Sequence, residues 1–177
     1  MTDPRFSNSY NELTSTFAVR TFMNVMPMIL EVLEKMKTEF YVEKNVCLSN
    51  GNRLLSVGPV DLFRMLSSIV ELYKYCPHRQ VIDAMLSVCY KLVANFLVEF
   101  RKLVLEGEDI DLDNYCALAN SNIKFMGCMR SFLDNIKDMT GVPVENLQKS
   151  FQQNFLMKNF AEISNASYLR IQDLVKT

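Results

Sequence analysis

Few residues of this chain have the type and spacing that catalysis needs. The chain has 177 residues and one histidine, His78, so it contains no histidine pair for zinc and one candidate imidazole base. It has no glycine-rich phosphate loop and no nucleophile elbow. Because no carboxylate adjoins His78 to orient its ring, we expect this residue, just after Pro77, to lie on the surface or to cap a helix. We therefore expect no enzymatic activity; an enzyme would have to use His78 or a cysteine.

The cysteines predict neither a disulfide framework nor a metal site. Their number is odd, and none form a C-x-x-C pair; they are Cys47, Cys76, Cys89, Cys116 and Cys128. The last three lie in apolar helical patterns, where a free cysteine behaves as a small hydrophobic residue. Segment 1–10 lacks the apolar stretch of a signal peptide, and no apolar run approaches the roughly 18 residues of a membrane span. These features favour a cytoplasmic protein that is neither secreted nor membrane-spanning.

Three aspartates at alternate positions resemble the first ligands of a calcium-binding EF-hand loop. They are Asp109, Asp111 and Asp113. Such a loop also needs a glycine at its sixth position, which is missing here, and a bidentate glutamate at its twelfth position, which here is Asn120. We therefore favour a solvated acidic linker over 106–113 that complements the N-terminal dipole of the next helix. Calcium binding stays open as an alternative, and no other metal or cofactor is expected.

Polar residues on the expected fourth helix favour contacts within the fold over ligand binding. Asn120 and Asn122 lie at or beside an apolar stripe, where a buried amide is costly unless it is hydrogen bonded. We expect these amides to fix the register between helices. Lys124, Arg130 and Lys137 could gather on one side of this helix, but three charges are too few to indicate phosphate binding. The formal net charge of -1 likewise gives no reason to expect nucleic-acid binding.

Composition predicts an all-α fold. Hydrophobic residues make up 49% of the chain and charged residues 22%, which is enough apolar content for a packed core. Only 5 glycines and 5 prolines are present, too few for the many turns of an all-β fold, and no segment alternates as a strand does. We expect a single domain over 1–177, folded as a bundle of about five to six antiparallel helices.

Apolar residues spaced three and four apart place the expected helices along the chain. The expected elements are a first long helix over 10–45 that kinks or restarts at Pro27, a loop over 46–59, and the remaining helices over 60–177. Within the last range the pattern indicates a helix over 60–75, a helix that opens at Pro77 and is capped by Gly107, a helix from 115 that ends at Gly141, and a final helical segment with a break near Asn165.

Three motifs, in order along the chain, carry a resemblance to a known family. They are Val-Asp-Leu-Phe-Arg-Met at 60–65, a long apolar helix over 81–105, and Tyr-Cys-Ala-Leu-Ala-Asn-Ser-Asn at 115–122, with a further helix over 146–174. In order and spacing this region resembles the C-terminal helical region of the Sec-six subunit of the exocyst. That family has its two asparagines adjacent, whereas here Ser121 separates them.

The resemblance implies a vesicle-tethering protein, a rod of stacked helical bundles that holds a secretory vesicle at its target membrane. The chain would then be a non-enzymatic interaction module and one segment of a longer rod. The implied partners are other tethering-complex subunits, SNARE proteins and small GTPases. We expect the motif residues to lie in the core, so no binding residue is predicted.

Two alternatives remain open at this stage. One is a helical bundle that binds calcium or a small apolar ligand, suggested by the acidic linker and by the 11 methionines and 12 phenylalanines. The other is a self-assembling structural bundle, suggested by the heptad-like apolar stripes.

Overall fold

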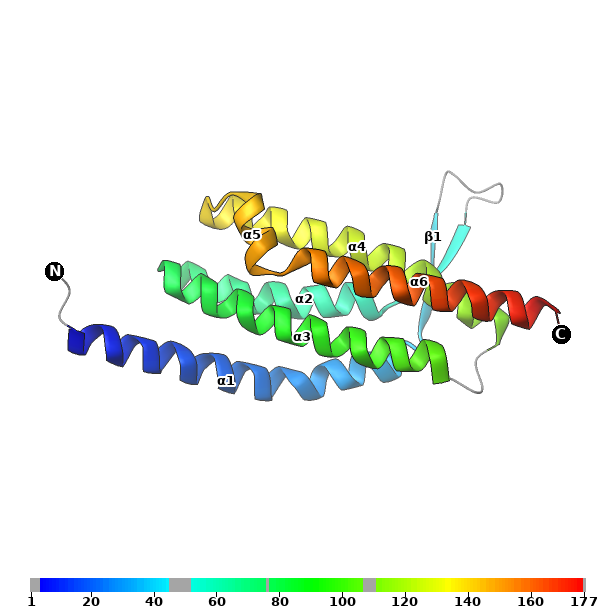
Figure 1. The fold of residues 1–177 in the computed structure, drawn as a ribbon, viewed down its shortest axis with the longest axis horizontal. Helices are drawn as coiled ribbons and strands as arrows, with labels where there is room; N and C mark the ends of the chain where they lie inside the picture. The colour runs from blue at the N-terminus through cyan, green and yellow to red at the C-terminus, as the bar shows by residue number, and fades with distance from the viewer. Residues whose placement is uncertain (1–3, 45–51, 76, 107–110, 177) are drawn as a thin grey trace.

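The chain folds as an all-α bundle with one small β-hairpin (Figure 1). The structure is a computed structural model and describes residues 4–44, 52–75, 77–106 and 111–176. Its elements, in chain order, are α1 (Pro4–Lys35), β1 (Phe40–Lys44), β2 (Asn52–Ser56), α2 (Gly58–Glu71), a 3-10 helix (Leu72–Tyr75), α3 (Arg79–Glu106), α4 (Leu112–Thr140), α5 (Val144–Ser150) and α6 (Gln153–Lys176). The expected all-α fold class is therefore confirmed.

The long helices lie side by side along one axis in three layers (Figure 1). Helix α1 forms one outer layer and packs on α3 and α2, which form the middle layer. Helices α4 and α6 form the opposite outer layer; α4 packs on α2, and α6 packs on α3 and α4. The short helix α5 packs against α4, α6 and α3.

A cluster of phenylalanine rings joins four helices at the centre of the bundle. Phe125 of α4 is fully buried, and its ring centroid lies 4.9 Å from that of Phe63 on α2, 5.6 Å from Phe96 on α3 and 4.4 Å from Phe160 on α6. Aromatic pairs at these distances stabilise a core beyond the area that they bury. The high phenylalanine content thus serves the core, which favours packing over the small-ligand alternative.

The first long helix is shorter than expected, and a hairpin follows it. Helix α1 ends at Lys35, and residues expected to continue it form β1, which pairs antiparallel with β2. The prediction of a helix over 10–45 and a loop over 46–59 is therefore wrong at this point, and α2 already begins at Gly58. Phe40, Tyr41 and Val42 are aromatic and β-branched residues that suit a strand, but five residues are too few to show alternation.

Helix α1 continues through Pro27 without restarting. Proline removes one backbone donor, and the residue lies on the exposed side of the helix, where water can satisfy the carbonyl that is left. The inward-facing residues Ile29, Leu33 and Met36 are buried against the bundle, as their spacing predicted.

The other helix boundaries follow local capping chemistry. The carboxylate of Asp111 accepts a hydrogen bond from the backbone of Asn114 at 2.8 Å and caps α4, and Gly141 ends α4 with a φ of 68°. The end at Gly141 was predicted, whereas Asp111 was expected only as part of an acidic linker near the start of this helix. The break in the last segment lies at Gln152, with a φ of 47°, and the expected break near Asn165 is wrong because α6 runs unbroken through it. Gly107 lies outside the described residues.

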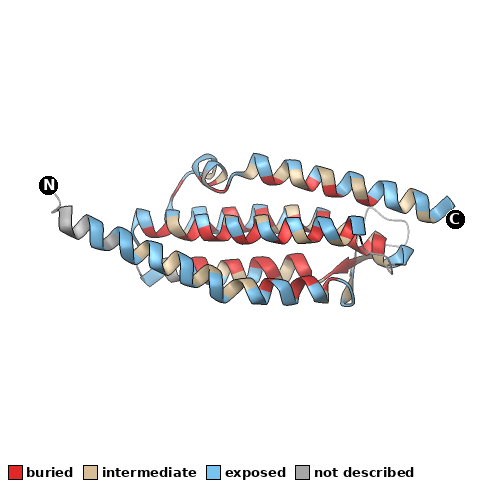
Figure 2. Ribbon diagram, turned by 60° about the horizontal axis from the view of Figure 1, so that its bottom comes forward, coloured by how far each residue is buried: buried red, intermediate tan, exposed pale blue. Residues whose placement is uncertain are grey.

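Burial is uneven along the bundle (Figure 2). Buried residues line the inner sides of the helices, whereas no described residue of α1 before Ile29 and none of α6 after Ser167 is buried. The two ends of the chain lie at opposite ends of the long axis (Figure 1). The overhanging parts of α1 and α6 thus leave apolar side chains uncovered at both ends of the bundle.

Replacing either of two glycines by alanine is expected to change the stability of the chain in opposite directions. A Cβ added at Gly58 would overlap the side chain of Met36, whereas one added at Gly127 meets no atom within 4 Å. We expect Gly58→Ala to lower the free energy of unfolding by about 1–3 kcal/mol through overpacking. We expect Gly127→Ala, the matched control, to raise it by up to about 1 kcal/mol, because alanine is the better helix former. Urea denaturation measures both; equal effects would contradict the close packing at Gly58.

Candidate interaction site

Two neighbouring polar residues of α4 hold the hairpin against the bundle. The amide of Asn120 donates to the carbonyl oxygen of Leu54 at 3.1 Å, and the hydroxyl of Ser121 accepts from the backbone N–H of Ser56 at 2.6 Å. The Ser121 hydroxyl in turn donates to the carbonyl of Ala117 at 2.7 Å, so this buried group is used fully. These bonds satisfy backbone groups of β2 that would otherwise be buried without partners.

The next polar residue of α4 contacts α6. The amide of Asn122, which is 1% exposed, donates to the carbonyl of Phe160 at 3.0 Å and to the hydroxyl of Ser164. Its own carbonyl oxygen has no partner among the described residues. The prediction of a contact between helices is therefore confirmed for Asn122, whereas it is wrong for Asn120, which bonds to strand β2.

The register of the hairpin determines which backbone groups face outward. Val57 N–H donates to Glu39 C=O, and the pairing continues with Tyr41 opposite Leu55 and Glu43 opposite Arg53. In an antiparallel ladder the alternate residues point their N–H and C=O groups away from the partner strand. On β2 these outward groups belong to residues that α4 binds; on β1 they belong to Phe40 and Val42, and nothing in the described part of the chain bonds to them.

A three-residue ion cluster ties the side chains of the hairpin to α4. Glu43 of β1 accepts from Arg53 of β2 at 3.0 Å and from Lys124 of α4 at 2.5 Å. The hydrogen bond from Lys124 is the main cause that lowers the pKa of Glu43, and the same bond raises the pKa of Lys124. One carboxylate here serves two cations, so the cluster carries a net positive charge.

Two buried donors beside this cluster lack acceptors. The hydroxyl of Tyr41 and the Nε of Arg53 have no hydrogen-bond partner in the part of the chain that the structure describes. Burial raises the pKa of the Tyr41 hydroxyl, so this group stays protonated and remains a donor. Two unsatisfied donors therefore lie beside the surplus positive charge of the cluster.

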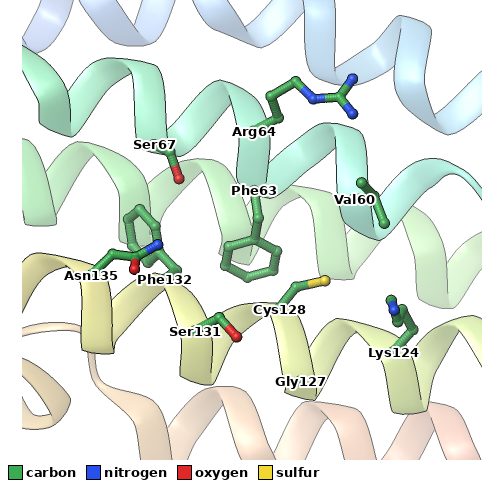
Figure 3. Close-up of a pocket in the computed structure, with 10 residues that line it drawn as sticks. All are labelled: Val60, Phe63, Arg64, Ser67, Lys124, Gly127, Cys128, Ser131, Phe132 and Asn135. Atoms are coloured by element: carbon green, nitrogen blue, oxygen red, sulfur yellow. The ribbon is translucent and has the colours of Figure 1, made fainter.

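A groove between α2 and α4 begins at the ion cluster (Figure 3). It has a volume of about 460 Å³, with Lys124 and Val60 at one end and Asn135 and Phe132 at the other. Small residues from both helices line it, and Phe63 forms part of its floor. Because Gly127 has no side chain, another chain can approach the backbone of α4 closely at this point.

His78 has the capping role predicted for it. Its Nδ1 accepts from the backbone N–H of Gln80 at 3.3 Å, and its carbonyl accepts from Val81 and Ile82, so it begins α3 on an exposed surface. No group of three or more histidine, cysteine, aspartate or glutamate side chains that could hold a metal occurs among the described residues. Asp109 of the acidic linker lies outside them, so the calcium alternative stays a prediction.

The described cysteines are unpaired. Cys89 is fully buried in α3, and burial raises the pKa of its thiol, as it also does for Cys116 and Cys128 on α4. A raised thiol pKa disfavours the reactive thiolate. Cys47 and Cys76 lie outside the described residues.

The three basic residues of α4 do not gather on one side. Lys124 is paired with Glu43, and at about 100° per residue Arg130 lies about 240° around the helix from it. Lys137 shares the side of Arg130, and both are exposed. The structure therefore offers no cluster of these three residues.

Helix α1 carries a second, uncovered apolar stripe beside its buried one. Val19, Met23 and Leu30 are spaced four and seven residues apart, so they share one side of the helix, and Met23 is 66% exposed. Segment 13–30 contains a single charged residue, Arg20. A helix with so few charges and so little burial has a side that remains available for contact.

Among the described residues, two helices are long and apolar enough to cross a membrane by length and composition alone, Asn11–Lys35 and Arg79–Glu106. The expectation from the sequence concerned unbroken apolar runs, whereas these helices contain scattered polar residues. Core helices also meet the criterion, and half of the most apolar window of Arg79–Glu106 is buried in the bundle. In Asn11–Lys35 only 17% of that window is buried.

Comparison of the chain with protein-family models, with curated proteins and with solved structures finds no match. The fold thus defines the chain as an α-helical bundle, and its function has to be inferred from its own residues.

The bond between Ser121 and the hairpin predicts a specific loss of stability. Ser121→Ala leaves the buried N–H of Ser56 without an acceptor, so we expect the free energy of unfolding to fall by about 1–3 kcal/mol. Ser131→Ala, an exposed serine on the same helix, is the matched control, for which we expect a change within about 0.5 kcal/mol. Urea denaturation measures both, and a Ser121→Ala chain as stable as the control would contradict the anchoring role.

The ion cluster predicts a pH dependence. Because the folded-state pKa of Glu43 is lowered, its stabilising effect is present above the unfolded pKa and disappears as the pH falls through the folded value. We expect Glu43→Gln to destabilise the chain at pH 7 by less than about 1 kcal/mol, because the pair is partly exposed. This difference should shrink as the pH falls below the unfolded pKa and through the lowered folded value.

The measurement is urea denaturation of both chains from pH 7 to pH 3. Glu12→Gln, which removes one exposed carboxylate of α1 away from the hairpin, is the matched control and should not reproduce the difference. A difference between Glu43→Gln and the parent chain that stays constant with pH would rule out the assigned pKa shift.

Proposed function

We propose that this chain is a non-enzymatic protein-interaction module of a vesicle-tethering complex of the exocyst type. Its partners are other tethering-complex subunits, SNARE proteins or small GTPases, and it acts in the cytoplasm, with peripheral association at the secretory or plasma membrane. The motifs at 60–65 and 115–122 that resemble the Sec-six subunit, together with the elongated bundle, support this proposal.

The uncovered apolar stripe of α1 is the observation that carries the interaction function. A surface helix normally places charged residues opposite its buried side. Here Val19, Met23 and Leu30 are exposed, and Arg20 is the single charge over 13–30. Exposed apolar surface of this kind is typical of protein–protein contacts. In a rod, the next bundle or a partner helix would cover it.

The residues of the motifs that resemble the Sec-six subunit contribute more to the fold of the module than to contacts with a partner. Leu62 and Phe63 of the first motif are buried, and so are Tyr115 and Asn122 of the second. The hydroxyl of Tyr115 donates to the carbonyl of Val104 at 2.6 Å and links α4 to the end of α3. A partner would therefore bind the outer surface of the bundle rather than these residues.

Affinity capture with the immobilised chain tests the proposal. We expect cytosol to yield tethering subunits or SNARE proteins, identified by mass spectrometry, with the parent chain. Met23→Glu places a charge in the exposed stripe and should reduce the capture about tenfold, because an apolar contact is replaced by a desolvated carboxylate. Asn24→Glu adds the same charge at the neighbouring exposed position and is the matched control, which should retain capture.

Three outcomes would count against the proposal. Capture that yields no tethering subunit or SNARE protein would remove the assignment to tethering. Equal capture by Met23→Glu and Asn24→Glu would show that the α1 stripe is not the contact. Flotation of the parent chain with neutral phospholipid vesicles, lost in Met23→Glu, would assign the stripe to a lipid surface instead.

A further inference from the structure

We infer that the open edge of β1, together with the adjoining groove between α2 and α4, binds an extended acidic segment of a partner protein by strand addition. This inference rests on the proposed function only in treating the chain as an interaction module. It assigns the binding mode and the chemistry of the partner, neither of which the apolar stripe of α1 defines.

The two edges of the hairpin differ in the hydrogen bonding of their outward-facing backbone groups. On β2 the outward C=O of Leu54 and N–H of Ser56 are bonded to α4 side chains. On β1 the outward groups of Phe40 and Val42 have no partner among the described residues, and Val42 is 62% exposed. Proteins usually protect such an edge with proline, a bulge or an inward charge. The five paired residues of β1 have no proline or bulge, and their inward charge, Glu43, is already paired with Arg53 and Lys124.

The spacing of contacts along α4 shows where an added strand would lie. β2 is held at Asn120 and Ser121, and β1 is held at Lys124 through Glu43. Neighbouring strands lie about 4.8 Å apart, and a helix rises about 1.5 Å per residue, so one strand spacing corresponds to about three residues of α4. The next strand would therefore cross α4 near Gly127.

Gly127 is the position on α4 where such a strand would find space. A Cβ atom added there would meet no atom within 4 Å. Gly127 also lines the groove between α2 and α4, which has a volume of about 460 Å³ (Figure 3). Lys124 and Cys128 line the same groove and lie on either side of this position. The open edge and the open space thus coincide.

The charge of the cluster selects an acidic segment. Arg53 and Lys124 share the single carboxylate of Glu43, which leaves one positive charge uncompensated. On an added strand, the residue opposite Tyr41 points to the face that carries this cluster, where the Tyr41 hydroxyl and Arg53 Nε lack acceptors. A carboxylate at that position supplies the missing charge, and apolar residues on either side pair with Phe40 and Val42.

An extended segment fits these features better than a helix or a second copy of the chain. A helix satisfies its own backbone groups and cannot bond to the outward groups of Phe40 and Val42. A second copy pairing through β1 would bring two positively charged clusters onto one sheet. Strand addition uses both the edge and the charge.

Fluorescence anisotropy with a labelled peptide, Ser-Thr-Val-Glu-Val-Thr-Ser, tests the inference. We expect saturable binding to the parent chain and binding at least about tenfold weaker to Val42→Pro, which removes an outward N–H that the hairpin itself does not use. Val42→Thr keeps this N–H and strand propensity and is the matched control; its affinity should stay within about twofold. Replacing the glutamate of the peptide by lysine should abolish binding, because the cluster is positive.

Hydrogen exchange keeps the test decisive if Val42→Pro disturbs the hairpin. In the parent chain, the peptide should slow exchange of the Val42 amide and leave that of the Ser56 amide unchanged, because Ser56 is already bonded to α4. Absence of binding, equal affinity of the lysine peptide, or unchanged exchange at Val42 would overturn the inference. Concentration-dependent dimerisation lost in Val42→Pro would also overturn it and assign the edge to a second copy.

The outcome is independent of the affinity-capture experiment. Peptide binding without capture of tethering subunits would retain strand addition and remove the tethering function. Capture that persists undiminished in Val42→Pro, without peptide binding, would retain the proposed function and remove strand addition.

Discussion

The hydrogen bonds between α4 and the outer edge of β2 are the interaction on which the rest of the site depends. A two-stranded hairpin alone is marginally stable in water. Here the buried hydroxyl of Ser121 and the amide of Asn120 bond to the outward-facing backbone groups of β2. The same helix bonds to α3 through Tyr115 and to α6 through Asn122. One helix therefore fixes the hairpin relative to the whole bundle. This placement determines the shape of the groove between α2 and α4.

Fixing one edge of the hairpin leaves the other edge open. The open groups of β1 are presented by a rigid support, since Glu43 bonds to Lys124 as well as to Arg53. A preorganised edge loses little conformational entropy when a partner strand pairs with it. The apolar stripe of α1 lies in the opposite outer layer of the bundle from α4 (Figure 1). The chain thus presents two surfaces of different chemistry, one apolar and helical, the other extended and positively charged.

Most of the helical fold was predictable because it depends on local periodicity. In α3 the apolar residues of one stripe repeat every three or four positions and are all buried; they are Ile82, Leu86, Cys89, Val93, Phe96 and Phe100. Gly141 acts through neighbouring backbone groups and was equally predictable. The hairpin was missed because strands of five residues show little alternation, and because β2 is stabilised by Ser121, 65 residues away. The sequence indicated that burying the amides of Asn120 and Asn122 costs free energy unless they are hydrogen bonded, but it did not indicate their hydrogen-bond partners.

The sequence by itself determined that this protein is helical, that its helices begin and end at particular capping residues, and that it contains few groups suited to catalysis. These properties follow from periodicity, composition and interactions between residues close in the chain. Only the tertiary structure decided which apolar residues stay uncovered and which strand edge stays open. Val19 and Leu33 are both apolar residues of α1, yet one is exposed and the other buried, because burial depends on whether another helix lies against that part of α1.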